Sequence, residues 1–145
     1  MHARAAAAVI VTVLSTLIVS CASMSMNDIK TKETILDDTL RMYAATLRWG
    51  DLTQGLGFVD PTYLQAHPVT DLELERYKQV RVTAYDDQPA APVNENEVRQ
   101  TVEIGLVNVN TQAARSVVDN QIWRYDEKGK RWWLTTGLPD LTRHH

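Results

Sequence analysis

The first clear pattern in the chain is a run of apolar residues spaced three or four positions apart between Lys32 and Trp49. This spacing gathers apolar side chains on one face of a helix, so it predicts an amphipathic helix whose face packs on a core. Gly50 follows, and glycine is a common residue just past the end of a helix. The predicted apolar face consists of Leu36, Leu40, Tyr43, Ala44 and Leu47.

Three short helical segments are predicted next, and each follows a residue that commonly caps a helix N-terminus. The caps are Asp51, Asp60 and Thr70. Asp60 is also followed by a proline, which is favoured at the first helical position. The segments end at about Phe58, at Ala66 and at about Glu75.

From Tyr77 the apolar period changes to two, which is the period of a half-buried strand. Val80, Val82 and Ala84 alternate there with polar positions. The following segment, 86–95, holds two prolines and several Asp and Asn residues, so it predicts a mobile loop.

Two longer strands are predicted at 98–109 and 115–126. In the first, Val98, Val102, Ile104 and Leu106 share a face, opposite Arg99, Thr101, Glu103 and Val107. Gly105 predicts a bulge or a sharp bend in its middle. In the second, Val117, Trp123 and Tyr125 face away from Val118 and Ile122. A hairpin at 126–130 leads to a last strand, 131–136.

Helices followed by three to four long antiparallel strands predict an α+β fold, with the N-terminal helices packed on one face of a curved sheet. The helix, Trp49-Gly50-Asp51, Asp60-Pro61 and a meander that ends Trp132-Trp133-Leu134 resemble the NTF2-like family. That resemblance covers about residues 32–139 and implies a conical pocket between sheet and helix. A cystatin-like sheet wrapped on one helix is the alternative.

The N-terminus has a different character. Arg4 precedes an uncharged apolar run of about 15 residues, from Ala5 to Val19. A membrane-spanning helix needs roughly 20 residues. A charged start, a short apolar run and small residues at its end are typical of an export signal, here residues 1–20.

The end of this run, Ile18-Val19-Ser20-Cys21, resembles a bacterial lipobox. The resemblance implies that the Cys21 sulfur receives a diacylglycerol and that cleavage falls just before it. Two or more acyl chains give stable anchoring in a lipid bilayer. Ala22 follows the cysteine, as in lipoproteins sent to the outer membrane. We therefore expect a lipidated tether over residues 21–31, a domain over 32–139 and a flexible tail over 140–145.

The composition further limits the classes of partner and the bonds that the chain can form. Cys21 is the only cysteine, so an internal disulfide is excluded. Without residues 1–20, the chain has 14 Lys and Arg against 18 Asp and Glu. This mildly acidic balance argues against nucleic acid as a partner.

Few residues outside the predicted signal suit catalysis. Histidine occurs there only at His67, His144 and His145, and Ser116 lies within a predicted strand. Neither a nucleophile with a base nor metal ligands at a suitable spacing is evident, so we expect no cofactor, no metal and no catalytic residue. Pocket candidates are Tyr43, Tyr63, His67, Arg99 and Glu103, although each also has a structural explanation.

Aromatic residues of the last two strands form a candidate interaction surface. Trp123, Tyr125 and Trp133 lie on adjacent predicted strands, and we expect Trp123 and Trp133 side by side. The alternative is a core face covered by the helices.

The leading hypothesis is an outer-membrane lipoprotein, facing the periplasm, whose domain is a non-catalytic binding or scaffold module of the cell envelope. Its partner would be an envelope protein, or a second copy bound through the sheet. Binding of a small apolar ligand in the cone is the alternative, and an isomerase- or dehydratase-type NTF2-like enzyme comes third.

Overall fold

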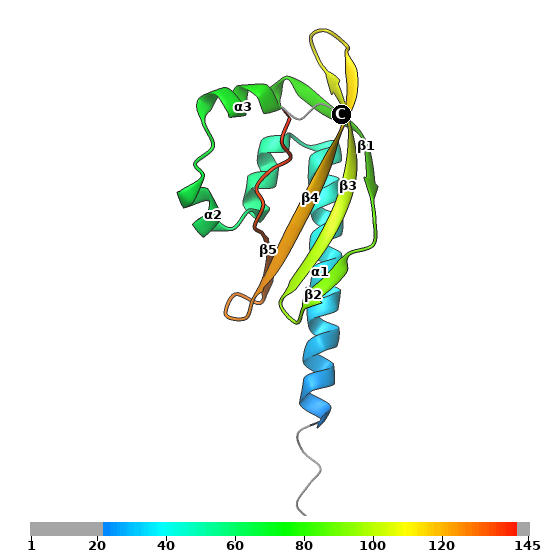
Figure 1. Cartoon of the computed structure of the whole chain (residues 1–145), viewed down its shortest axis with the longest axis vertical. Coiled ribbons are helices and arrows are strands. Elements are labelled where there is room, and N and C mark those ends of the chain that lie inside the picture. The colour runs from blue at the N-terminus through cyan, green and yellow to red at the C-terminus, as the bar shows by residue number, and fades with distance from the viewer. Residues whose placement is uncertain (1–21, 142–145) are drawn as a thin grey trace, which may run out of the picture.

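The computed structural model describes the backbone of residues 22–141 and the side chains from Thr31 to Leu141. Figure 1 shows one long helix, three short helical segments and a curved sheet. Cys21, residues 1–20 and residues 142–145 lie outside the described part of the chain.

The long helix α1 (Ala22–Trp49) begins ten residues before the predicted start at Lys32. The segment predicted as a lipidated tether, residues 21–31, is therefore helical in its backbone from Ala22 on. It lacks an apolar stripe, but it also lacks glycine and proline. A helix propagates readily through such residues once the packed part has formed. Beyond α1, the backbone nitrogen of Gly50 still bonds to the Thr46 carbonyl at 2.9 Å.

The short segments are η1 (Leu52–Phe58), a 3₁₀ helix, and the α-helices α2 (Pro61–Ala66) and α3 (Asp71–Lys78). Their predicted caps are confirmed. The side chains of Asp51 and Asp60 accept hydrogen bonds from backbone nitrogens two residues on, at 2.9 and 2.7 Å. Thr70 forms a reciprocal capping box with Glu73.

The sheet has five antiparallel strands, β1 (Val80–Asp87), β2 (Ala91–Asn94), β3 (Glu97–Asn108), β4 (Ala114–Asp126) and β5 (Arg131–Leu134). The order is β1-β3-β4-β5, and β2 pairs with the start of β3 along the edge that β1 occupies further on. Strand β2 lies in the segment predicted as a loop. That prediction was wrong because all four residues of β2 are exposed, so no alternation marks the strand.

The irregularity predicted at Gly105 lies in the neighbouring strand. The register of β1 shifts between Val82 and Ala84, opposite Gly105. A Cβ atom on Gly105 would lie 2.9 Å from the Thr83 hydroxyl oxygen and 3.1 Å from the Ala84 Cβ. Glycine therefore makes room for the bulge, which increases the local twist of the sheet.

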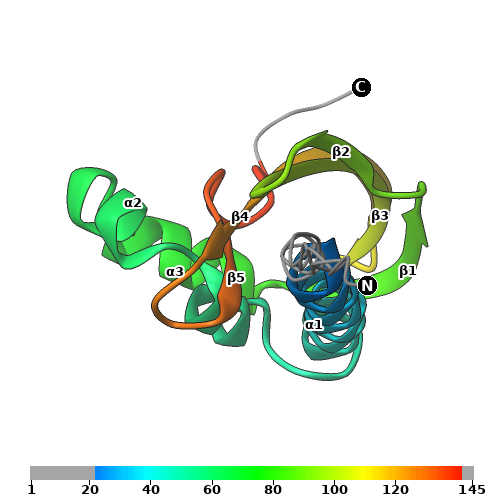
Figure 2. The ribbon, with the colours of Figure 1, turned by 90° about the horizontal axis from the view of Figure 1, so that it is seen from below.

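The sheet curls around α1 as a half-barrel, while α2 and α3 lie outside the arc beside β5 (Figure 2). The core fills the space between the concave face and α1. Its largest fully buried side chains include those of Trp123, Tyr43, Leu47, Ile104 and Leu134. The predicted α+β fold, with helices on a curved antiparallel sheet, is confirmed.

Lys32 of α1 contacts the turns and strands at one end of the sheet. Its Nζ donates a hydrogen bond to Asn96 Oδ1 at 2.9 Å and forms an ion pair with Glu127. Its carbonyl accepts a hydrogen bond from Trp132 Nε1 at 3.1 Å. At the other end of the chain, Leu141 is buried in the core, although the flexible tail was predicted to begin at residue 140.

Within the described residues, no helix combines the length and the apolar character that a membrane span requires.

Candidate functional site

The structure does not bring the five predicted pocket residues together. Tyr43 is fully buried in the core between the rings of Phe58 and Trp123, with centroid distances of 5.4 and 5.2 Å. Tyr63 and His67 stack on each other at 4.4 Å around α2, outside the cone. Arg99 and Glu103 are exposed on the convex face of β3, because their positions alternate with the buried ones.

The aromatic residues of the predicted interaction surface are also separated. Strand register pairs Trp123 with Leu134 and Arg124 with Trp133. Trp123 and Tyr125 are therefore in the core, whereas Trp133 is half-buried on the other face. The expectation that Trp123 and Trp133 lie side by side was wrong. In this hairpin each odd-numbered residue of β4 pairs with an even-numbered residue of β5. Trp123 and Trp133 are both odd-numbered, so their side chains point to opposite faces of the sheet.

A polar group on the concave face was missed at the sequence level, and we call it the inner polar cluster: Tyr85, Asp119, Gln121 and Trp123. Gln121 Nε2 donates to Asp119 Oδ2 at 2.8 Å and to the Tyr85 hydroxyl at 3.2 Å. Trp123 Nε1 donates to Gln121 Oε1 at 3.0 Å. The signal was present, because Asp119 and Gln121 share the parity of Val117 and Trp123 in β4.

Tyr43 lies beside this cluster, and its hydroxyl has no hydrogen-bond partner among the residues that the structure describes. Burial raises the pKa of Tyr43 well above its usual value of 10.0, and the charge of Asp119 raises it further. Burial also raises the pKa of Tyr85. Both phenols are therefore neutral hydrogen-bonding groups rather than acids at physiological pH.

A groove lies between α1 and the segment that leads from β1 through β2 to β3, and we call it the α1–β2 groove. Its volume is about 760 Å³. The apolar lining comprises Leu36, Leu40 and Ala44 of α1, together with Pro89, Ala90, Pro92 and Val98. Gln100 also lines the groove, and its Nε2 donates to the Gln88 carbonyl at 2.9 Å and to Asp87 Oδ2 at 3.3 Å.

The charged residues along this groove are mostly acidic. Glu33 and Asp37 contribute carboxylates from α1, and Asp87 contributes one from the end of β1. Arg41 is the basic residue of the lining, and its Nη1 lies 3.5 Å from Asp38 Oδ1 on the same helix. Three carboxylates against one guanidinium give the lining a formal net charge of −2.

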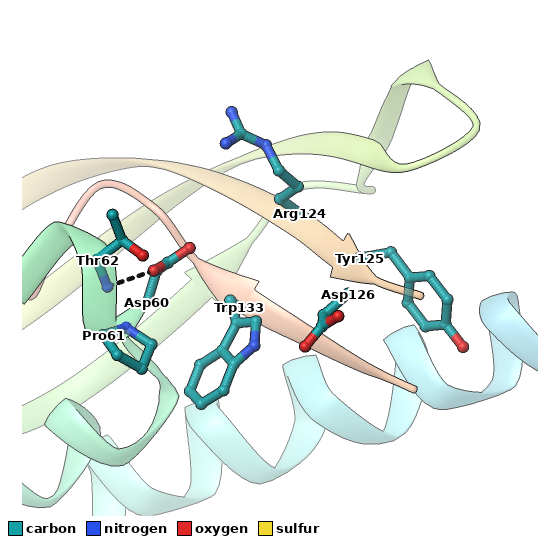
Figure 3. Close-up of a pocket in the computed structure, with 7 residues that line it drawn as sticks. All are labelled: Asp60, Pro61, Thr62, Arg124, Tyr125, Asp126 and Trp133. Carbon is teal, nitrogen blue, oxygen red and sulfur yellow. Dashed lines mark hydrogen bonds between the residues drawn. The ribbon is translucent and has the colours of Figure 1, made fainter. Parts of the chain in front are cut away.

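A smaller pocket of about 380 Å³ lies on the outer face of β4 and β5. Figure 3 shows Trp133 beside Asp126 and Pro61, with Arg124 directed away from them. The Arg131 guanidinium lies 3.5 Å from the centroid of the Trp133 ring.

The polar groups of this pocket have structural roles. Asp60 caps α2, and Asp126 accepts a hydrogen bond from the Lys128 backbone at 2.9 Å in the hairpin turn. Arg124 pairs with Glu97 at 3.4 Å. The α1–β2 groove is the better candidate because it is larger and has seven apolar lining residues, although Leu36 and Val98 also belong to the core.

The described side chains contain no group of three or more His, Cys, Asp or Glu residues placed to hold a metal ion. In comparisons with known proteins, no family model, no curated protein and no solved structure matches this chain.

Proposed function

We propose that this protein is a non-catalytic binding module of the bacterial cell envelope. Cys21 anchors it by lipid to the outer membrane, where the domain faces the periplasm. The domain binds an apolar segment of an envelope protein in the α1–β2 groove. The observation that carries this proposal is the groove itself, with about 760 Å³ of space along seven apolar residues. Small-molecule pockets have volumes of about 300–1,000 Å³, so this groove is large enough to hold several apolar side chains of a partner.

Three carboxyl groups outside the groove have structural roles. Hydrogen bonds from the Thr70 backbone lower the pKa of Glu73, and those from the Gly129 and Lys128 backbones lower the pKa of Asp126. A hydrogen bond from Lys32 lowers the pKa of Glu127. These carboxyl groups are stabilised as anions by caps, a turn and an ion pair.

The anchor is tested by comparing the wild type with Cys21→Ala in bacteria fed a clickable fatty acid. We expect label only in the wild type, with the protein in the outer-membrane fraction. Absence of label from both forms would refute the lipid anchor, and the domain would then require another route to the membrane.

The groove is tested with a matched pair of substitutions on α1. Ala44 lines the groove, whereas the neighbouring Ala45 is exposed and is not part of it. We expect Ala44→Trp to fill the groove and abolish the fluorescence enhancement of an apolar probe, N-phenyl-1-naphthylamine. Ala45→Trp should leave that enhancement unchanged. Equal probe binding by both variants would contradict the proposal.

A second candidate function is supported by the buried hydroxyl of Tyr43. A small molecule that displaced core side chains beside the inner polar cluster would give this group the hydrogen-bond partner that the described residues do not supply. Phenylalanine at position 43 separates the two functions, because it removes the hydroxyl without touching the α1–β2 groove.

A further inference from the structure

We infer that the occupant of the α1–β2 groove is a basic amphipathic helix of another envelope protein, with Lys or Arg residues flanking its apolar face. This inference rests on the proposed binding function and specifies the chemistry of the partner. It follows from the charge of the groove, from its two different walls and from its length.

The charge of the groove selects against anionic ligands. Glu33, Asp37 and Asp87 lie along the apolar lining, and the guanidinium of Arg41 is already close to Asp38. A fatty-acid carboxylate or a phospholipid headgroup would bring negative charge to this rim, and like charges repel. A cationic segment would instead place Lys or Arg against three carboxylates while its apolar side chains cover the lining.

The strand side of the groove disfavours binding by strand addition. Pro89 and Pro92 both line the groove, and Pro92 lies within β2 itself. Proline has no backbone N–H, so this segment cannot offer a continuous row of donors to an added strand. The available surface is made of side chains, and a helix laid in a groove uses side chains for its contacts.

The length of the helical wall fits a short helix. The lining of α1 extends from Glu33 to Ala44, and a rise of about 1.5 Å per residue makes this about 17 Å. A partner helix of about three turns covers that distance. In Figure 2, α1 lies within the arc of the sheet and β2 crosses the arc opposite it. Helix α1 forms one wall of the groove, and residues 87–100, which include β2, form the other.

The test uses the mature chain, residues 21–145, with Cys21→Ser so that no acyl chain competes for the groove. Three fluorescent peptides of 14 residues are titrated by anisotropy: one of Leu and Lys with an amphipathic pattern, one with Glu in place of Lys, and one with Ser in place of Leu. We expect the Leu/Lys peptide to bind at least about tenfold more tightly than either of the others. The preference should shrink as salt rises, because the Debye length falls from about 30 Å at 0.01 M to about 3 Å at 1 M.

A matched pair of charge reversals locates the effect. Asp37→Lys with Asp87→Lys should reverse the preference toward the Leu/Glu peptide. Glu103→Lys with Asp71→Lys changes the net charge equally outside the groove and should leave the preference for the Leu/Lys peptide in place. The same reversal by both double variants would overturn the inference, because the attraction would then follow net charge alone.

The remaining outcomes separate this inference from the proposed function. If the Leu/Lys and Leu/Glu peptides bind equally and Ala44→Trp abolishes both, the basic partner is refuted while the groove remains a binding site. If the naphthylamine probe binds but no peptide does, the inference is again refuted. If neither the probe nor any peptide binds, the proposed function fails as well.

Discussion

Replacing Tyr43 by phenylalanine is expected to stabilise the protein. The tyrosine ring is fully buried, and its hydroxyl has no hydrogen-bond partner among the described residues. Burying a hydroxyl without a partner costs about 1–3 kcal/mol in proteins. Phenylalanine keeps the edge-to-face contacts with Phe58 and Trp123 and removes only the unpartnered oxygen.

We expect the free energy of unfolding to rise by about 1 kcal/mol, the lower end of that range, because the vacated space leaves a small void. For a domain of this size, the midpoint of thermal unfolding should rise by about 4 °C. Urea unfolding followed by tryptophan fluorescence measures the free energy, and calorimetry measures the midpoint.

Tyr77→Phe provides the matched control. The Tyr77 hydroxyl donates to the Pro139 carbonyl at 3.2 Å, so this variant should lose about 1 kcal/mol. If Tyr43→Phe is destabilised as much as Tyr77→Phe, the Tyr43 hydroxyl has a partner in solution and the reasoning is refuted. A ligand that protects the wild type but not Tyr43→Phe would support the small-molecule function inside the cone.

Three further substitutions test the fold. Gly105→Val should destabilise the protein by about 1–3 kcal/mol in urea unfolding, because its Cβ would lie 2.9 Å from the Thr83 hydroxyl; an unchanged midpoint would show that the bulge relaxes freely. Thr70→Ala removes the cap of α3 and should cost about 1 kcal/mol, whereas Thr70→Ser should retain most of it. Lys32 lowers the pKa of Glu127 below its ordinary 4.5, so this ion pair stabilises the fold above pH 4.5, and its contribution disappears as pH falls through the folded-state pKa. Wild type should therefore exceed Glu127→Gln in stability at pH 7 and converge with it in acid; a constant difference would contradict the ion pair.

Periodicity was sufficient to predict the elements that have one buried face. The apolar stripe of α1 and the alternating positions of β3 and β4 are buried where the pattern places them. The caps of the short helices were also predictable, since a cap is a local interaction between a side chain and a backbone group two or three residues away.

Elements whose sequence carries no apolar pattern could not be predicted in this way. Strand β2 exposes all four of its residues, and the extension of α1 before Lys32 has no apolar stripe. The face of Trp133 depends on the register that the hairpin sets between β4 and β5, which the strand pattern alone leaves open. A one-residue difference in register reverses every side chain of a strand.

The candidate site was less predictable than the fold because it is formed by distant segments. The α1–β2 groove combines residues 33–44 with residues 87–100. Pro89, Ala90 and Pro92 belong to a segment whose sequence predicts a loop. Leu40 and Val98 were each correctly placed on apolar faces. That they leave space between them depends on how the helix lies within the curved sheet.

Helix α1 is both the first described element after Cys21 and a wall of the groove, and no break separates these two parts. Leu40 follows Ala22 by 18 residues, which is about five full turns, so the two positions share an azimuth around the helix axis. If Cys21 carries the proposed anchor, the number of residues before Lys32 would set the distance between the groove and the membrane, and also the direction of the groove relative to Ala22. Adding one residue there would rotate the groove by about 100° and move it outward by about 1.5 Å, while every contact inside the domain stays the same.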